Sequence, residues 1–276
     1  MTLRQSLAAL GFALAIDART SPARAADLSP TTLAAFERYV QATEQRIAAE
    51  VQSGDRFLWP DTLSTTERNL RLASLNRGEL VIERLTTTRQ GKAIDLPGGL
   101  VHHWLGVAFL PGVRIDRAVE LLQDYDRHAA VYAPRVARSA LRAHDGNTFR
   151  FHLRFLMKKV ITVVIDSENL AEFSRPSPER AFSRIVSTRM AEIDDAGTPS
   201  EKEKPIGHDS GYLWRLNSYW RFAERDGGTY LQCESVSLTR GIPVGFGWLV
   251  GPFVTSLPRE SLEFTLETTR RALAPH

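Results

Sequence analysis

The spacing of apolar and polar positions changes near residue 79. Residues 31–52 and 65–76 carry apolar side chains three and four positions apart, which predicts two helices. Beyond them, apolar and polar residues alternate in short runs separated by glycine and proline, which predicts antiparallel strands. The expected strands are 79–86, 91–95, 100–110, 136–143, 148–158, 161–173, 180–193, 212–222 and 229–240.

Two stretches depart from this alternation. Residues 114–132 have apolar positions at helical spacing and predict one or two short helices, and residues 261–273 predict a terminal helix. The apolar segment before that helix contains Pro252 and Pro258. A helix there is expected to kink or to restart, with Ser256 as the N-cap of the restart.

The last two strands form the strongest local pattern. They flank Asp226-Gly227-Gly228, a sequence that favours a tight hairpin turn. Neither strand has one wholly apolar and one wholly polar face, so both faces are expected to contact something other than plain water. Such mixed faces are typical of strands that line a ligand pocket.

The first 25 residues have the pattern of a secretory signal. Arg4 precedes an apolar run over 7–16, and Ala23-Arg24-Ala25 forms an A-x-A site. We expect cleavage after Ala25 and a periplasmic or secreted mature protein; the alternative is an amphipathic or disordered tail. The run is too short for a stable membrane anchor, and no later segment reaches about 18 uninterrupted apolar residues. No transmembrane helix is therefore expected in the mature chain.

Composition fits a packed domain, since 43% of the 276 residues are hydrophobic. Removing residues 1–25 takes away three arginines and one aspartate, and the formal charge falls from +3 to +1. This gives no electrostatic reason to expect nucleic acid as a partner. The single cysteine, Cys233, excludes an intramolecular disulfide and is expected to be buried packing. The expected organisation is a signal peptide over 1–25, a helical extension over 26–78 and a main domain over 79–276.

The order of strand, two small helices, antiparallel strands and a long terminal helix resembles the helix-grip fold of the START and SRPBCC superfamily. The resemblance covers about residues 79–274, and its most specific part is the strand ESVSLTR at 234–240 followed by Gly247-Trp248-Leu249-Val250. It implies an α+β fold in which a curved antiparallel sheet wraps around the C-terminal helix and encloses a cavity. The expected signal and the N-terminal helical extension depart from familiar lipid-transfer members.

Glu234 is a carboxylate in the middle of a strand, which must be paired or face a wet cavity because burying it alone costs several kcal/mol. The resemblance implies an ion pair inside the cavity that orients a polar ligand head. The alternative is a cross-strand pair on the outer face. The candidate partners are five strand cations, among which the sequence does not choose: Arg154, Lys158, Arg189, Arg215 and Arg240. The residues expected to bind ligand are Glu234, Gln232, Tyr219, Asn217, Arg154, Arg189, Trp248 and Phe253.

No metal or cofactor is expected. His102 and His103 are adjacent in a strand, so they point to opposite faces and cannot chelate one ion together. The sequence contains no G-x-S-x-G, C-x-x-C, H-E-x-x-H or phosphate-loop pattern.

Three functions remain open. The leading one is a non-enzymatic exported protein that holds a hydrophobic or amphipathic, lipid-like molecule in the cavity. The second, which the resemblance also implies, is an enzyme similar to polyketide cyclases or dehydratases, with Glu234, Tyr219 or His152 as the acid or base. The third is a periplasmic interaction module whose apolar segment from Trp248 to Phe253 docks to a partner or transiently to a membrane face.

Overall fold

The computed structural model describes residues 26–158, 162–241 and 247–274, with the backbone alone over 247–255. Nine strands of these described ranges form one antiparallel sheet, in which β10 pairs with β9 beside the main order β2-β5-β13-β12-β9-β8-β7-β6. The strands are β2 (Val81–Arg84), β5 (Gly99–Pro111), β6 (Val136–Asp145), β7 (Thr148–Lys158), β8 (Thr162–Ser177), β9 (Arg180–Asp194), β10 (Lys202–Glu203), β12 (Arg215–Arg225) and β13 (Gly228–Arg240). Two small pairs lie apart, β1 (Ala26–Asp27) with β11 (His208–Asp209) and β3 (Thr88–Arg89) with β4 (Lys92–Ala93).

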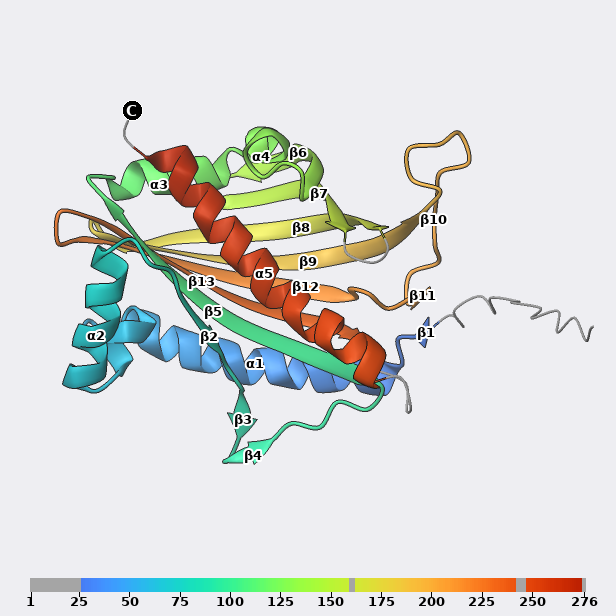
Figure 1. Cartoon of the computed structure of the whole chain (residues 1–276), viewed down its shortest axis with the longest axis horizontal. Coiled ribbons are helices and arrows are strands. Elements are labelled where there is room, and N and C mark those ends of the chain that lie inside the picture. The colour runs from blue at the N-terminus through green and yellow to red at the C-terminus, as the bar shows by residue number, and fades with distance from the viewer. Residues whose placement is uncertain (1–25, 159–161, 242–246, 275–276) are drawn as a thin grey trace, which may run out of the picture.

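Helices cover both faces of the sheet (Figure 1). The C-terminal helix α5 (Gly247–Leu273) crosses the face that we call the inner face, and α1 (Pro30–Gln52) lies on the opposite, outer face. The other helical elements are η1 (Trp59–Thr62), α2 (Thr65–Asn76), α3 (Ile115–Gln123), η2 (Tyr125–Arg127) and α4 (His128–Val131). No helix in the described ranges is long and apolar enough to cross a membrane.

The ends of α1 and α2 follow from their capping residues. Ser29 accepts a hydrogen bond from the Thr32 backbone N–H at 3.0 Å, and Pro30 occupies the first turn of α1. Ser64 is the N-cap of α2, and its side chain accepts a hydrogen bond from the Glu67 backbone N–H. The side chains of Ser64 and Glu67 form a second hydrogen bond of 2.7 Å. The predicted helices over 31–52 and 65–76 are therefore confirmed to within one residue.

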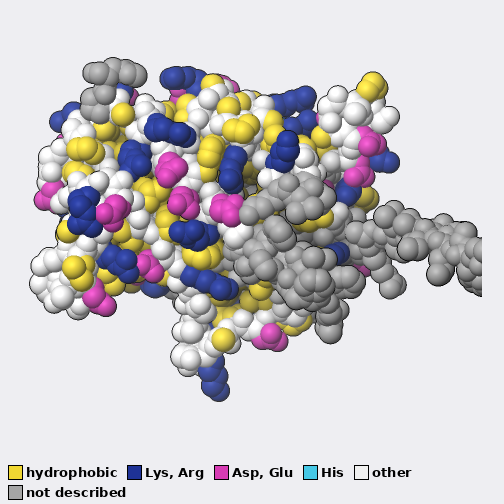
Figure 2. Space-filling model, viewed as in Figure 1, with side chains coloured by type: hydrophobic (Ala, Val, Ile, Leu, Met, Phe, Trp, Pro, Cys, Tyr) yellow, Lys and Arg dark blue, Asp and Glu magenta, His cyan; other side chains and the backbone are white. Residues whose placement is uncertain are grey.

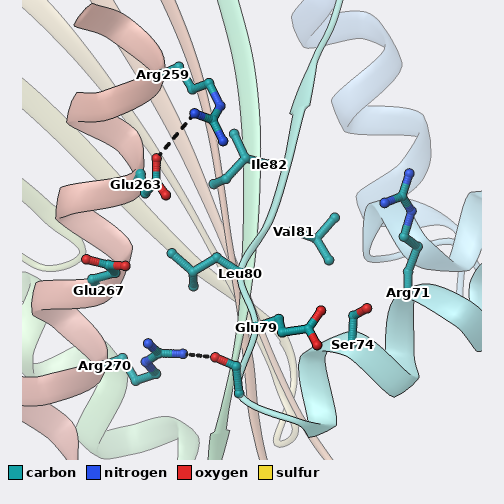
Figure 3. A pocket seen from close by; sticks show the side chains of 11 residues that line it. Arg71, Ser74, Glu79, Leu80, Val81, Ile82, Arg259, Glu263, Glu267 and Arg270 are labelled. Carbon is teal, nitrogen blue, oxygen red and sulfur yellow. Dashed lines mark hydrogen bonds and ion pairs between the residues drawn. The ribbon is translucent and has the colours of Figure 1, made fainter. Parts of the chain in front are cut away.

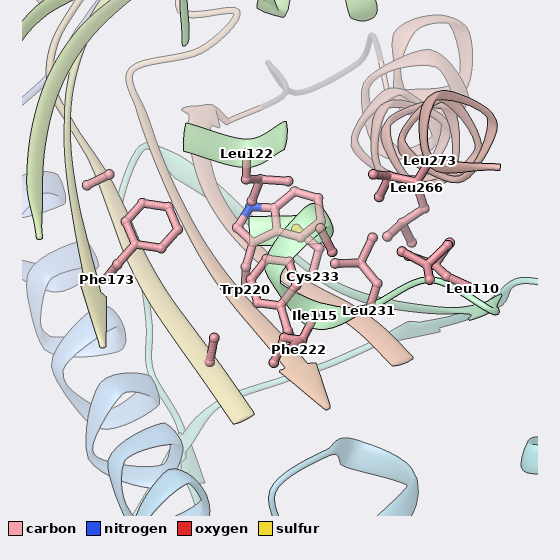
Figure 4. Close-up of a cluster of buried hydrophobic side chains, with 14 of the residues drawn as sticks. Leu110, Ile115, Leu122, Phe173, Trp220, Phe222, Leu231, Cys233, Leu266 and Leu273 are labelled. Atoms are coloured by element: carbon pink, nitrogen blue, oxygen red, sulfur yellow. The ribbon is translucent and has the colours of Figure 1, made fainter. Parts of the chain in front are cut away.

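Each face of the sheet has its own apolar core. On the inner face, Leu262 and Leu266 of α5 pack with strand residues that include Trp220, Leu231 and Cys233 (Figure 4). The outer-face core joins α1 to the same central strands through Phe36, Tyr39, Ile47, Tyr219, Val236 and Leu238. Because β12 and β13 are buried on both faces, their side chains do not divide into an apolar and a polar set.

The α+β helix-grip architecture predicted from the sequence is confirmed, since an antiparallel sheet curves around a C-terminal helix (Figure 1). Two local predictions were wrong. The strand expected over 91–95 is only the two-residue β4, which pairs with β3 outside the main sheet. The terminal helix does not restart at Ser256 but runs unbroken from Gly247 through Pro252 and Pro258. Each proline removes one backbone donor, and the bonds of the neighbouring turns suffice to continue the helix.

Candidate functional site

The inner face of the sheet divides into an aromatic half and a half rich in small hydroxyl side chains. Toward α3, Trp220 and Phe222 pack beside Leu122 of that helix in the inner-face core (Figure 4). Toward the beginning of α5, the register of the strands places Ser235 opposite Ser218. In the next inner-face row, Ser237 lies opposite His102 and Leu216. The row of Ser235 and Ser218 also holds Trp104 opposite Ser235 and Ile185 opposite Ser218. The floor beneath α5 therefore changes along the helix from apolar to a mixture of hydroxyl and apolar side chains.

One buried hydroxyl of the inner face has no hydrogen-bond partner among the described residues. The Ser183 hydroxyl is completely buried on the inner face, in register with Trp220, and no described residue pairs with it. Ser218 and Ser235 are only partly buried. An unpaired buried hydroxyl is unusual in a folded protein and is typical of a site that water or a ligand completes.

The titratable groups of this floor are neutral at physiological pH. His102 is hydrogen-bonded to the Thr239 hydroxyl at 3.0 Å, and burial together with the nearby charge of Arg84 lowers the pKa of His102 to about 4. Burial likewise raises the pKa of the Cys233 thiol, so it stays protonated. These groups present hydrogen-bonding atoms without charge.

Two tyrosines occupy the aromatic half. Tyr125 stacks on Phe151 with ring centres 3.8 Å apart, and its buried hydroxyl has no partner among the described residues. The Tyr132 hydroxyl is instead hydrogen-bonded to Thr269 of α5 at 2.9 Å. Burial raises the pKa of Tyr125 and raises that of Tyr132 to about 12, so both hydroxyls remain neutral donors. Sequence reasoning missed both tyrosines, because a helical aromatic is usually core.

The carboxylate of Glu234 lies on the outer face beneath α1, not on the inner face beneath α5. It is completely buried, pairs with Arg46 of α1 and accepts a 2.7 Å hydrogen bond from His103 Nε2. None of the five strand cations expected as its partner is in this pair. The expectation failed because the partner comes from the N-terminal helix, 188 positions away in the chain.

The electrostatics of Glu234 favour the ionised form. Burial acts to raise the pKa of Glu234, but the hydrogen bond from His103 and the charges of Arg46 and Arg221 hold it below its ordinary value. Since a carboxylate only accepts, His103 donates through Nε2, while its Nδ1 lies 2.9 Å from the Tyr39 hydroxyl. The arrangement is a buried ion pair with hydrogen bonds around it.

The other three predicted polar residues of the hairpin also lie beneath α1 and the loop that follows it. Tyr219 donates to Glu44 of α1 at 2.9 Å, and Asn217 donates to the Tyr219 hydroxyl at 3.3 Å. Gln232 accepts a 2.6 Å hydrogen bond from the Trp59 backbone N–H. The structure thus brings Glu234, Gln232, Tyr219 and Asn217 together, but on the outer face of the sheet and not beneath α5.

The two predicted arginines are not near Glu234. Arg154 makes a bidentate pair with Asp166 at 2.7 Å and a second pair with Glu201 at 2.9 Å, and Arg189 pairs with Glu203. The side chains of Trp248 and Phe253 lie outside the described residues. The ligand-binding role of all eight predicted residues stays a prediction, and the six that are described do not line the inner face beneath α5.

The acid or base candidates of an enzyme are displaced in the same way. Phe151 faces the inner core, so its neighbour His152 points to the outer side, where it lies 3.3 Å from Asp166. Glu234 and Tyr219 also face outward. Within the described residues, no group of three or more histidine, cysteine, aspartate or glutamate side chains is placed to hold a metal ion.

Two surface grooves of about 400 Å³ each flank the edge of the sheet. The first runs between α2, β2 and α5 and is lined by charges of both signs, including Arg71, Glu263 and Arg270 (Figure 3). The second has an apolar floor that includes Phe109 and Val113. Basic and acidic side chains are also interleaved over the part of the surface that Figure 2 draws in colour. Neither groove opens on the hydroxyl-rich floor.

No family model and no curated protein matches the chain. Solved structures match it over part of its length. A STAR-related lipid transfer protein from Xanthomonas axonopodis is 17% identical, with 66% of this chain and 96% of that fragment covered and a TM-score of 0.43. The human StarD13 lipid transfer and protein localization domain is 8% identical, with 78% and 99% covered and a TM-score of 0.43. The Zhui aromatase/cyclase from Streptomyces is 10% identical, with 63% and 94% covered and a TM-score of 0.41.

Proposed function

We propose that the protein binds a hydrophobic or amphipathic, lipid-like small molecule between the inner face of the sheet and α5. The observation that carries the proposal is the division of that face into an aromatic half and a neutral, hydroxyl-rich half. Such a surface matches a molecule with an apolar body and an uncharged polar group. The unpaired hydroxyl of Ser183 supports the same conclusion, since a ligand would satisfy it.

The first test is native mass spectrometry of the mature protein purified from its own host, followed by organic extraction. A stoichiometric lipid or polyketide-like molecule is the expected result. An empty protein that also fails to bind a panel of apolar fluorophores would remove ligand carriage as the function.

A variant of the inner face then tests whether the ligand binds there. Ser235→Phe adds a large side chain to the inner face and is expected to reduce ligand occupancy at least tenfold, a change of about 1.4 kcal/mol. Ser200→Phe makes the same change on an exposed loop and is expected to leave occupancy unchanged. Equal occupancy in both variants would mean that the molecule binds elsewhere.

We also propose that the protein is exported. The basic residue, the apolar run and the A-x-A site within residues 1–25 support this, and the single cysteine is compatible with an oxidising compartment. Fractionation of the host followed by N-terminal sequencing tests it. A periplasmic or secreted chain beginning at Ala26 is expected, and a cytosolic chain that keeps residues 1–25 would contradict export.

A further inference from the structure

Three buried polar atoms on neighbouring residues of the outer face have no hydrogen-bond partner among the described residues. They are Arg221 Nε, Gln232 Nε2 and Glu234 Oε2, and all three residues are 0% exposed. Arg221 of β12 lies directly opposite Gln232 of β13, and Glu234 follows two positions along the same strand. All three side chains therefore project from one small area of one face.

Arg221 and Glu234 are linked by a chain of ion pairs that passes through α1. Arg221 donates to Glu50 at 2.7 Å and to the Phe57 carbonyl at 2.8 Å. Glu50 in turn accepts from Arg46 at 3.0 Å, and Arg46 also donates to Glu234 Oε1. The chain begins on β12 and ends on β13. Its two end atoms, Arg221 Nε and Glu234 Oε2, have no hydrogen-bond partner among the described residues, and neither has Nε2 of Gln232, which lies opposite Arg221 in the register.

The chemistry of the three unpaired atoms defines which partner could bind all of them. Two N–H donors and one carboxylate acceptor require an atom that accepts two hydrogen bonds and donates one. The two arginines and two glutamates of the chain cancel in charge, so the position does not favour an ion. All three side chains are 0% exposed, so the partner must be small enough to be enclosed by the protein. A water molecule meets each of these conditions.

We propose that one water molecule is bound beneath α1, where it accepts from Arg221 Nε–H and Gln232 Nε2–H and donates to Glu234 Oε2. The water closes the chain of ion pairs into a ring that joins α1, β12 and β13. The interface between α1 and the outer face of the sheet therefore contains a hydrated polar contact with apolar packing on either side. This site is separate from the inner face where we propose that the ligand binds.

A high-resolution crystal structure of the whole mature protein tests the proposal. One peak of water density within hydrogen-bonding distance of all three atoms is expected. A bromide soak with anomalous scattering serves as the check for an anion. Direct pairing of the three atoms with protein groups, or an anomalous peak at the position, would overturn the proposal.

A count of long-lived internal waters by oxygen-17 relaxation dispersion provides the second test. Gln232→Leu removes one of the two donors at nearly the same volume, and the count is expected to fall by one. Gln52→Leu, which makes the same change at an exposed end of α1, is expected to leave the count unchanged. An unchanged count in Gln232→Leu would overturn the proposal even if the ligand on the inner face is confirmed.

Discussion

The guanidinium of Arg46 on α1 is paired with the buried carboxylate of Glu234 on β13. The Arg46 side chain keeps 37% of its exposure, whereas Glu234 is completely enclosed and also accepts from His103. The pair therefore reaches from the surface of the N-terminal helix into an interior strand of the sheet. Charge as well as apolar packing fixes α1 on the outer face.

Replacing Glu234 with glutamine is expected to destabilise the protein by about 3 kcal/mol, because it leaves Arg46 and His103 without the buried charge that they contact. Urea unfolding followed by tryptophan fluorescence measures the effect. The control is Glu203→Gln, which breaks the exposed pair with Arg189 and is expected to cost at most about 1 kcal/mol. Equal losses in the two variants would show that the buried pair contributes no more than a surface pair.

The same carboxylate makes stability depend on pH. The pKa of Glu234 is lower in the folded protein than its ordinary value of 4.5, so its contribution is complete above that value and is lost as the pH falls through the folded pKa. We expect the free energy of unfolding to decline below about pH 4.5 and to decline less steeply in Glu234→Gln. Urea unfolding at a series of acidic pH values measures both slopes. Parallel slopes would mean that other carboxylates account for the acid sensitivity.

The sequence predicts the helix-grip order well because its local signals agree with one another. The hairpin of β12 and β13 turns at Asp226 and Gly227, both with positive φ, as Asp-Gly in a tight turn requires. The capping serines likewise locate the beginning of α1 and of α2. These features depend only on neighbouring residues.

The candidate site was less predictable because alternation separates the two faces of a strand without saying which one meets α5. Cys233 and Glu234 must point to opposite sides, but helices cover both sides, and polarity does not distinguish them. The resemblance to helix-grip proteins favoured Glu234 as the inner residue. Its actual partner Arg46 lies on a helix outside the region of resemblance, so no pattern within the strands could identify it.

Gly106 is expected to control how closely α5 approaches the sheet. A Cβ atom at this position would clash with Leu266 Cδ1 of α5 and lie 2.9 Å from Ile82 Cδ1. Gly106→Ala is therefore expected to cost about 1 to 3 kcal/mol in stability and to loosen α5. Labelling of Cys233, which is buried beneath α5, by a thiol reagent measures the loosening and is expected to be faster than in the parent protein.

The control for that variant is Gly54→Ala, at a position where the added Cβ meets no atom within 4 Å apart from those of its chain neighbours. It is expected to change the free energy of unfolding by less than about 1 kcal/mol. The rate at which Cys233 is labelled is expected to stay the same. Slow labelling in Gly106→Ala, equal to that of Gly54→Ala, would show that Leu266 moves aside without displacing the helix.

The two buried tyrosines beneath α5 differ in the bonding of their hydroxyls. The Tyr132 hydroxyl is hydrogen-bonded within the protein, whereas the Tyr125 hydroxyl has no described partner. Tyr132→Phe breaks the hydrogen bond to Thr269 and is expected to cost about 1 kcal/mol of stability. Tyr125→Phe removes a hydroxyl that has no described partner, so it is expected to leave stability unchanged or to raise it. Differential scanning calorimetry of the ligand-free proteins measures both. If the ligand contacts Tyr125, its affinity falls in Tyr125→Phe while stability holds, an outcome that packing alone would not produce. A stability loss in Tyr125→Phe as large as that in Tyr132→Phe would show that its hydroxyl is already bonded within the protein.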